Sequence, residues 1–158
     1  ELVAARIRKV QYLSKKLVAL PGIRVPAVRP DTTHAYYVLP VLFDASVVGV
    51  PRDVFIEAVR AELPPTKLRE SEGPKVSAGY VAPLYLLPIF QKQIAFGRDG
   101  YPFSLAKKRA ISYAKGNCPV VERLEGEELC LIDLIHPSMT ESDLDDVFCA
   151  FEKVFAFI

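Results

Sequence analysis

The residues best suited to site chemistry lie between positions 79 and 103. Aromatic rings in this stretch provide stacking area, and the polar groups beside them provide directed hydrogen bonds, a combination typical of the rim of a ligand pocket. Packing of a long loop onto its own sheet accounts for the same residues equally well. The aromatic residues are Tyr80, Tyr85, Phe90, Phe96, Tyr101 and Phe103, the glycines are Gly79, Gly97 and Gly100, and the polar residues are Gln91, Lys92, Gln93 and Arg98.

A metal site has little support in the sequence. Zinc sites need Cys and His at short ligand spacings, but 11, 5 and 12 residues separate the candidates Cys118, Cys130, His136 and Cys149. An odd number of cysteines in a chain of this size favours reduced thiols over disulfides. Cys149 is predicted to be buried beside the apolar stripe of the last helix, and Cys118 to stand directly before a helix.

Nucleophilic and phosphate-binding chemistry also lack a signature. His34 opens an aromatic segment and His136 precedes a proline in a turn, so both are expected to be surface or hydrogen-bonded histidines. None of the eight glycines falls into a glycine-rich phosphate-binding motif. The acidic cluster is interpreted as the solvated flank of a short helix, and its members are Glu122, Glu125, Glu127 and Glu128.

Composition limits the class of protein further. A chain of 158 residues with 51% hydrophobic and 25% charged residues is typical of one globular domain. The net charge of +1 is too small to give an electrostatic footprint for nucleic acid or an anionic membrane. No apolar stretch approaches the roughly 20 residues of a membrane span, and no signal pattern opens the chain. We therefore expect a cytoplasmic protein with neither a nucleic-acid nor a membrane partner.

Helices at both ends of the chain are the clearest elements. Apolar residues at three- and four-residue steps predict a helix over residues 1–20, which Pro21 and Gly22 end. No capping residue precedes this periodic run, so we expect the chain to be part of a longer protein. At the other end, Thr140 as cap with Asp143 at the capping-box position begins the last helix. Its expected apolar stripe is Leu144, Val147, Phe148, Phe151, Val154, Phe155 and Ile158.

Between these helices the sequence predicts strands, shorter helices and a long loop. Residues 34–43 and 129–134 are predicted strands, with Pro40 marking an edge or a bulge in the first. A helix is expected over residues 51–63, with Val54, Phe55, Ala58 and Val59 facing inward. Five prolines in residues 64–88 predict a long loop, and short helices are expected at 105–113 and 120–124. Few strands among several helices predict an α+β fold, an α/β sandwich whose small, mostly antiparallel sheet has helices packed on one face.

Six segments in order resemble the C-terminal small domain of the DegT/DnrJ/StrS group of PLP-dependent, fold-type-I sugar aminotransferases. The most specific segments are GYVAPLYLLP and CPVVERL in that order and spacing, and the resemblance covers nearly the whole of residues 1–158. The other segments are LVALPGIRVP, HAYYVLPVLF, GVPRDVFIEAV and LCLIDLIHPSMTESDLDDVFCAFEKVF. The resemblance implies a single small domain from an enzyme that aminates keto-sugars, usually nucleotide-linked.

The resemblance also implies where the chemistry lies. In this group a separate large domain carries the Schiff-base lysine and the binding site for pyridoxal 5'-phosphate, so this chain alone is expected to hold no cofactor and to be inactive. The small domain presents residues to the substrate, and position by position these correspond to Tyr80 and Tyr85, with Gln91 and Lys92 behind them. Many members have a basic residue and a histidine at the positions of Ala78 and Tyr85, and the connection between Leu63 and Val76 is longer here.

Two hypotheses from different classes follow. The first is a part of a sugar aminotransferase that acts as a homodimer on a keto-sugar and an amino-acid donor. The second is a stand-alone, non-catalytic binding or interaction module with the same fold. The uncapped first helix favours the first hypothesis.

Overall fold

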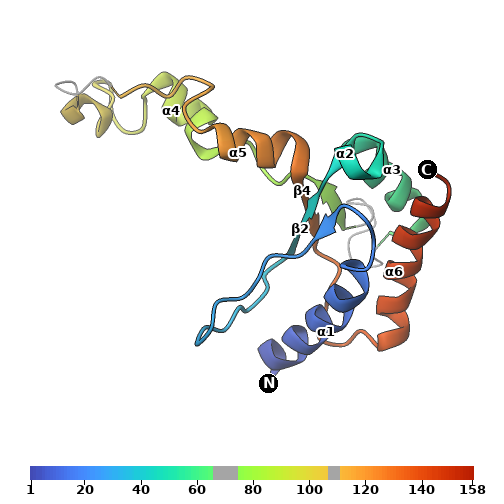
Figure 1. The fold of residues 1–158 in the computed structure, drawn as a ribbon. Helices are drawn as coiled ribbons and strands as arrows, with labels where there is room; N and C mark the ends of the chain where they lie inside the picture. The colour runs from blue at the N-terminus through green and yellow to red at the C-terminus, as the bar shows by residue number, and fades with distance from the viewer. Residues whose placement is uncertain (66–74, 107–110) are drawn as a thin grey trace. The chain divides into compact units, whose positions relative to one another are not determined.

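The computed structural model describes residues 1–65, 75–106 and 111–158 (Figure 1). Contacts divide the chain into two compact units. Unit 1 comprises Glu1–Tyr80 and Glu127–Ile158, and unit 2 comprises Val81–Gly126. Unit 2 is therefore inserted between two segments of unit 1.

Unit 1 contains an antiparallel sheet of four short strands in the order β1-β2-β4-β3. The strands are β1 (Ile23–Arg24), β2 (Leu39–Phe43), β3 (Val76–Ala78) and β4 (Leu129–Ile132). Strand β4 comes last in the sequence but lies between β2 and β3, opposite Leu39–Leu42 on one side and Val76–Ala78 on the other. The predicted small antiparallel sheet is confirmed.

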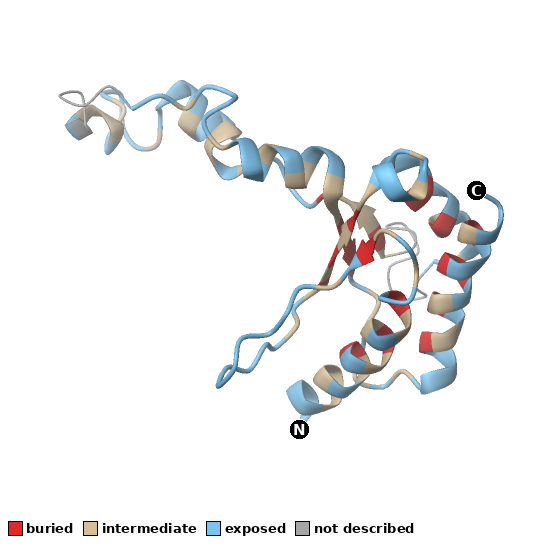
Figure 2. Cartoon of the chain, in the orientation of Figure 1, coloured by how far each residue is buried: buried red, intermediate tan, exposed pale blue. Residues whose placement is uncertain are grey.

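Three helices lie on the same side of this sheet, as Figure 1 shows: α1 (Leu2–Leu17), α3 (Arg52–Glu62) and α6 (Glu141–Ala156). Their apolar stripes meet the alternate residues Leu39, Val41 and Phe43 of β2, and the buried residues of unit 1 gather between the two layers (Figure 2). The predicted capping box of α6 is present, because Thr140 Oγ1 accepts from the Asp143 N–H and Asp143 Oδ2 accepts from the Thr140 N–H. The predicted α+β class is confirmed.

Details of the helices differ from prediction. Val54 is 59% exposed and Ala58 is also exposed, so their predicted inward orientation is wrong. Phe55 and Val59 are buried as predicted, and the third buried apolar residue of α3 is Ile56. Cys149 is exposed as well, because it lies on the solvent side of α6, whereas the buried thiol is that of Cys130 in β4. Ile158, expected in the apolar stripe, lies beyond the end of α6 and is 52% exposed.

The first predicted strand is shorter than expected because its first residues form a turn. Tyr36 has φ +50°, and its N–H donates to His34 Nδ1 over 2.9 Å, so regular pairing starts only at Leu39. Pro40 lies on an interior strand, but β1 reaches only to Leu42 and leaves the β1 side of Pro40 unpaired. A proline is tolerated there because no partner strand requires its missing N–H.

The predicted loop over residues 64–88 is wrong at β3, a proline-free segment that pairs with β4. Of this stretch, residues 66–74, which hold most of the long connection after Leu63, lie outside the described residues. Two short elements of unit 1 were also not predicted: strand β1 and helix α2 (Ala45–Val48), which Asp44 caps through the Ser46 N–H. Neither is long enough to show a periodic pattern.

Unit 2 consists of short helical segments joined by irregular chain. These are a 3-10 turn over Leu84–Leu86, helix α4 (Pro88–Lys92), a 3-10 turn over Phe103–Ala106 and helix α5 (Pro119–Arg123), which continues as a π-helical turn over Leu124–Glu128. Cys118 directly precedes α5, as predicted. The predicted helix over 105–113 is wrong at its end, since residues 111–113 are not helical, and residues 107–110 lie outside the described residues.

Candidate functional site

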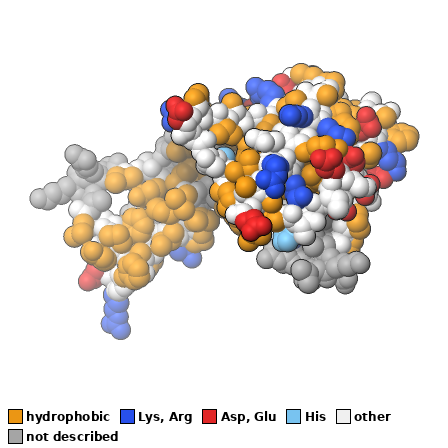
Figure 3. Space-filling view, turned by 90° about the horizontal axis from the view of Figure 1, so that it is seen from below, with side chains coloured by type: hydrophobic (Ala, Val, Ile, Leu, Met, Phe, Trp, Pro, Cys, Tyr) orange, Lys and Arg blue, Asp and Glu red, His pale blue; other side chains and the backbone are white. Residues whose placement is uncertain are grey.

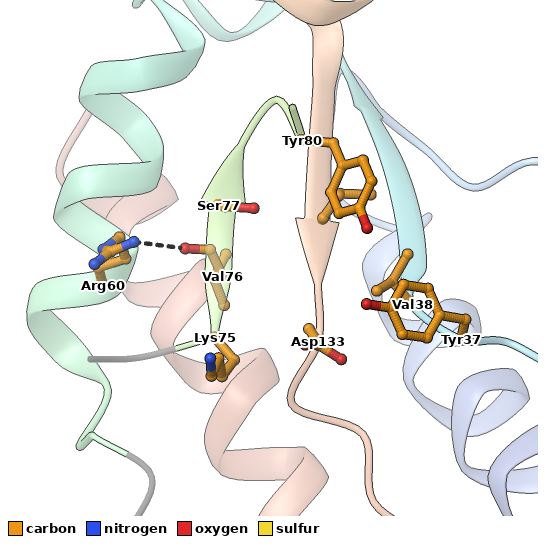
Figure 4. Close-up of a pocket in the computed structure, with 9 residues that line it drawn as sticks. Tyr37, Val38, Arg60, Lys75, Val76, Ser77, Tyr80 and Asp133 are labelled. Atoms are coloured by element: carbon orange, nitrogen blue, oxygen red, sulfur yellow. Dashed lines mark hydrogen bonds between the residues drawn. The ribbon is translucent and has the colours of Figure 1, made fainter. Parts of the chain in front are cut away.

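Tyr80 lines a cavity of about 260 Å³ in unit 1 (Figure 4). Its apolar side chains include Leu131, which is 6% exposed, and its polar side chains come from several elements. The lining residues are Tyr37, Val38, Arg60, Lys75, Val76, Ser77, Tyr80, Leu131 and Asp133. This is the strongest candidate site because it joins one predicted site residue to a concave surface with aromatic, cationic and acidic groups.

Strand ends position the polar side chains of this cavity. Tyr37 stands two residues before β2, Tyr80 two residues after β3, and Asp133 directly after β4. Two backbone hydrogen bonds hold these ends: the Gly79 N–H donates to Leu129 O over 2.7 Å, and the Asp133 N–H donates to Lys75 O over 2.8 Å. Residues distant in the sequence are thereby brought to one place by antiparallel pairing.

The two tyrosines of the cavity interact with one another. Figure 4 shows the Tyr80 side chain directed toward Tyr37, with Asp133 below Tyr80 and at the level of Tyr37 in this view. The hydrogen bond with Tyr37 raises the pKa of Tyr80, and the partial burial of the ring and the negative charge of Asp133 add to this effect. Tyr80 is therefore a neutral hydroxyl at physiological pH, able to donate or accept a hydrogen bond.

Basic side chains lie at the β3 side of the cavity. Arg60 of α3 donates from Nη1 to Val76 O over 3.2 Å, and Lys75 precedes β3 directly. The Ser77 hydroxyl donates to Gly79 O over 3.2 Å. The cavity thus has an acidic and phenolic end and a basic end.

The other predicted site residues lie in unit 2. The Tyr85 hydroxyl donates to Glu122 Oε1, and the same oxygen accepts from the Gly116 N–H over 2.6 Å. Desolvation, followed by this hydrogen bond, raises the pKa of Tyr85 to about 12. The bonds from Tyr85 and Gly116 lower the pKa of Glu122, so the pair is a phenol held by a carboxylate.

Gln91 ties two segments of unit 2 together. Its side-chain Nε2 donates to Tyr85 O over 2.8 Å and to Tyr113 O over 2.7 Å. Lys92 is the exposed last residue of α4. The structure therefore brings Tyr85 and Gln91 together in unit 2, while Tyr80 belongs to unit 1.

Two expectations about this region change. Glu122 is not a solvated flank residue, because it is half-buried and accepts the bonds of Tyr85 and Gly116. Sequence reasoning also missed Tyr37 and Asp133 as lining residues of the cavity. The available signals were an aromatic pair in HAYYVLPVLF and an acidic residue ending the apolar strand LCLI.

The histidines and cysteines do not gather into a site. His34 stacks on Tyr36 with ring centroids 4.1 Å apart, and His136 Nδ1 accepts from the Ser138 N–H in a turn. Across residues 1–65, 75–106 and 111–158, no three His, Cys, Asp or Glu residues are placed to hold a metal ion. Within the same ranges no helix has the length and apolarity needed to cross a bilayer.

The fold of this chain matches part of several solved aminotransferases. The aminotransferase TlmJ from Streptoalloteichus hindustanus matches 99% of the chain with a TM-score of 0.62 and 22% identity. An aminotransferase from Psychrobacter cryohalolentis matches 99% of the chain with a TM-score of 0.67 and 22% identity. A DegT DnrJ EryC1 StrS aminotransferase from Brucella abortus matches 96% of the chain with a TM-score of 0.58 and 19% identity. The resemblance seen in the sequence is thus confirmed for the fold.

The chain accounts for only part of each of these proteins. It covers 32% of TlmJ, 35% of the Psychrobacter enzyme and 31% of the Brucella enzyme. Among curated proteins, an uncharacterised protein of Methanocaldococcus jannaschii is 27% identical and the spore coat polysaccharide biosynthesis protein SpsC of Bacillus subtilis 24% identical, each over 135 residues. The 135 matched residues are 85% of this chain but only 27% of the length of either relative. No family model matches the chain.

Proposed function

We propose that this chain is the small domain of a PLP-dependent sugar aminotransferase of the DegT/DnrJ/StrS group. The full-length enzyme would transfer an amino group from an amino-acid donor to a keto-sugar, which is nucleotide-linked, and would act as a homodimer. The single observation that carries this proposal is the match of 99% of the chain to about a third of two solved aminotransferases. The relative SpsC, named for polysaccharide biosynthesis, supports a sugar substrate.

In this proposal the small domain presents side chains to the substrate. Tyr80, Tyr85, Gln91 and Lys92 are the proposed substrate-binding residues, and the position of Tyr80 on a concave surface supports its role. The raised pKa values of Tyr80 and Tyr85 keep both hydroxyls protonated at neutral pH. They would therefore bind and orient the substrate and would not act as bases in proton transfer.

We propose that the described residues alone do not bind pyridoxal 5'-phosphate. This cofactor, which supplies the electron sink for amino transfer, needs a Schiff-base lysine and a phosphate cradle. Lys9 donates to Met139 O, while Lys16 and Lys153 pair with Asp145 and Glu62. No lysine or glycine-rich loop of the sequence matches the family's cofactor motifs. We propose that the cofactor is bound by another part of the longer protein.

Two assays, carried out on the full-length protein and on this chain alone, test this function. The full-length protein, supplied with pyridoxal 5'-phosphate, glutamate and a nucleotide-linked keto-sugar, should produce an amino-sugar detectable by mass spectrometry. The 158-residue chain alone should produce none. It should also form no stoichiometric, borohydride-stable attachment of the cofactor at one defined lysine.

The outcomes separate the two hypotheses. A full-length protein that lacks a cofactor lysine and shows no amino transfer would support the non-catalytic binding module. Stoichiometric trapping of the cofactor in the chain alone would contradict the assignment of cofactor binding to another part of the protein. The nucleotide sequence upstream of the codon for Glu1 provides the cheapest first observation.

A further inference from the structure

We propose that the cavity beside Tyr80 is a subsite for the hydroxyl groups of a single sugar ring, with Tyr37 and Asp133 as the binding residues that set its specificity. This inference rests on the proposed function for its substrate class. Neither residue is among the substrate-facing positions that the sequence indicates.

The shape of the cavity fits one ring. Pockets for drug-sized ligands begin at roughly 300 Å³, so a cavity of about 260 Å³ suits a single hexose better than a whole nucleotide-linked sugar. Leu131 lines the cavity with an apolar side chain, and the rings of Tyr37 and Tyr80, labelled in Figure 4, line it as well. Sugar rings have C–H faces that pack on such surfaces and hydroxyls at their edges.

The polar end of the cavity matches hydroxyl groups. A carboxylate such as that of Asp133 accepts hydrogen bonds, whereas the hydroxyls of Tyr37 and Tyr80 both donate and accept. Neighbouring sugar hydroxyls need this mixture of acceptors and donors. The carboxylate of Asp133 repels phosphate or carboxylate ligands at this end, and a metal ion would lack further acidic ligands among the residues that line the cavity.

The walls are held in place without a ligand. Hydrogen bonds of the Gly79 and Asp133 N–H groups fix the chain beside two of the polar residues, and β2 pairing begins two residues after Tyr37. Tyr37 and Tyr80 are 71% and 57% exposed, so a ligand can reach both side chains. A subsite built on strand ends needs little ordering when it binds, which favours affinity.

Direct binding to the chain tests this proposal independently of catalysis. Saturation-transfer NMR with D-glucose as the probe should show magnetisation transfer to the ring protons. Asp133→Asn should weaken binding at least about tenfold, because it removes a charged acceptor, and Tyr37→Phe about fivefold. The matched controls Asp99→Asn and Tyr101→Phe change the same residue types in unit 2 and should stay within about twofold.

The result can go against the proposal in three ways. Absence of D-glucose transfer to the wild-type chain, with circular dichroism confirming that it is folded, would overturn the subsite. Equal loss in Asp133→Asn and Asp99→Asn would also overturn it. Binding of inorganic phosphate in place of D-glucose would identify an anion site at the basic end and reject the sugar subsite.

Kinetics of the full-length enzyme separate the two proposals. Asp133→Asn should raise KM for the keto-sugar about tenfold while KM for glutamate and the absorption spectrum of the cofactor stay unchanged. Wild-type kinetics in this variant would reject the subsite and leave the proposed function intact. D-glucose binding to the chain without amino transfer by the full-length protein would reject the proposed function and leave the subsite intact.

Discussion

Unit 1 has a core of buried apolar side chains, whereas the described part of unit 2 has none. Every buried hydrophobic residue identified belongs to unit 1, and none of the described side chains of residues 81–105 and 111–126 is buried. Hydrophobic side chains cover much of the visible face of unit 2 (Figure 3, left). Its exposed large hydrophobic residues are Val81, Leu84, Ile89, Ile94, Phe96, Tyr101, Leu105, Ile111, Val120 and Val121. Unit 1 thus contains the packed core, and unit 2 presents the kind of surface that other protein usually covers.

The two units are also stabilised differently. Unit 1 has a continuous core of aromatic and aliphatic side chains. Unit 2 relies on polar clamps at Glu122 and Gln91 and on the aromatic trio Phe90, Phe103 and Tyr113, whose rings lie 5.4 to 6.1 Å apart. Its seven Lys and Arg against three Asp and Glu give it a charge of +4, while the whole chain carries +1. Mutations should therefore act globally in unit 1 and locally in unit 2.

The largest effect is expected from removing a core ring of unit 1. Phe55 is fully buried, with its ring 5.1 Å from Phe43, 5.9 Å from Phe151 and 4.9 Å from Phe155. Phe55→Ala should lower the free energy of unfolding by about 3–5 kcal/mol in urea titrations. Phe96→Ala in unit 2 should cost less than about 0.5 kcal/mol, because Phe96 is 71% exposed. Equal losses of unfolding free energy in Phe55→Ala and Phe96→Ala would contradict the difference in packing between the two units.

A smaller loss is expected at the junction of the two units. Leu129 O accepts from the Gly79 N–H and, over 3.0 Å, from Nη1 of Arg52, which is 5% exposed. Gly79 and Leu129 flank unit 2 in the sequence, so this cluster joins the two segments of unit 1 on either side of the insertion. Arg52→Met should cost about 2–3 kcal/mol of unfolding free energy, since the Leu129 carbonyl loses a charged donor and Asp53 loses its ion-pair partner. Arg8→Met on the exposed side of α1 is the control, and an equal loss there would exclude the junction as the cause.

A third effect, on the order of 1 kcal/mol, should appear in activity rather than stability. In the full-length enzyme, Tyr85→Phe should lower kcat/KM about fivefold and leave the melting temperature nearly unchanged, because Tyr85 belongs to the unit without a buried core. Thermal melts and steady-state kinetics measure both quantities. A loss of several degrees with wild-type kinetics would restrict Tyr85 to a structural role with Glu122. Tyr101→Phe provides the matched control.

The same contrast explains how much of the fold was predictable. Elements of unit 1 with long periodic stripes, α1, α3 and α6, follow from the spacing of their apolar residues. Strand β3 was missed because three residues between proline-rich stretches show no pattern of their own, and only pairing with β4 makes them a strand. In unit 2 no stripe exists: the helix expected at 120–124 corresponds to α5, α4 was not predicted, and residues 111–113 were assigned wrongly.

The candidate site was predictable only in part. Tyr80 belongs to a dense aromatic segment that the sequence displays directly. Tyr37 and Asp133 meet it through the register of β2, β4 and β3, which a single sequence does not contain. Glu122 illustrates the same limit, because its partners Tyr85 and Gly116 lie far from it or in irregular chain. Residue type indicated the chemistry, and long-range pairing decided which groups share a site.

The smallest effect concerns pH and tests whether the hydrogen bonds accepted by Glu122 stabilise unit 2 but not unit 1. The bonds from Tyr85 and Gly116 lower the pKa of Glu122 below its ordinary 4.5. A carboxyl whose folded pKa is depressed contributes stability above its unfolded pKa and loses it as the pH falls through the folded pKa. Between pH 7 and about 3, amide protection should therefore fall in residues 81–126, while the core of unit 1 keeps its protection.

Hydrogen exchange with mass spectrometry, corrected for intrinsic rates, measures this difference. Glu122→Gln cannot ionise, so its protection in unit 2 should be reduced at pH 7 and should change little on acidification. Asp99→Asn, an exposed carboxyl in the same unit, should follow the wild type at every pH. If unit 1 lost protection first, or if Glu122→Gln kept the wild-type pH dependence, Glu122 would not be the titrating clamp. The two units would then share one acid transition, and the division between a packed scaffold and a clamped insertion would fail.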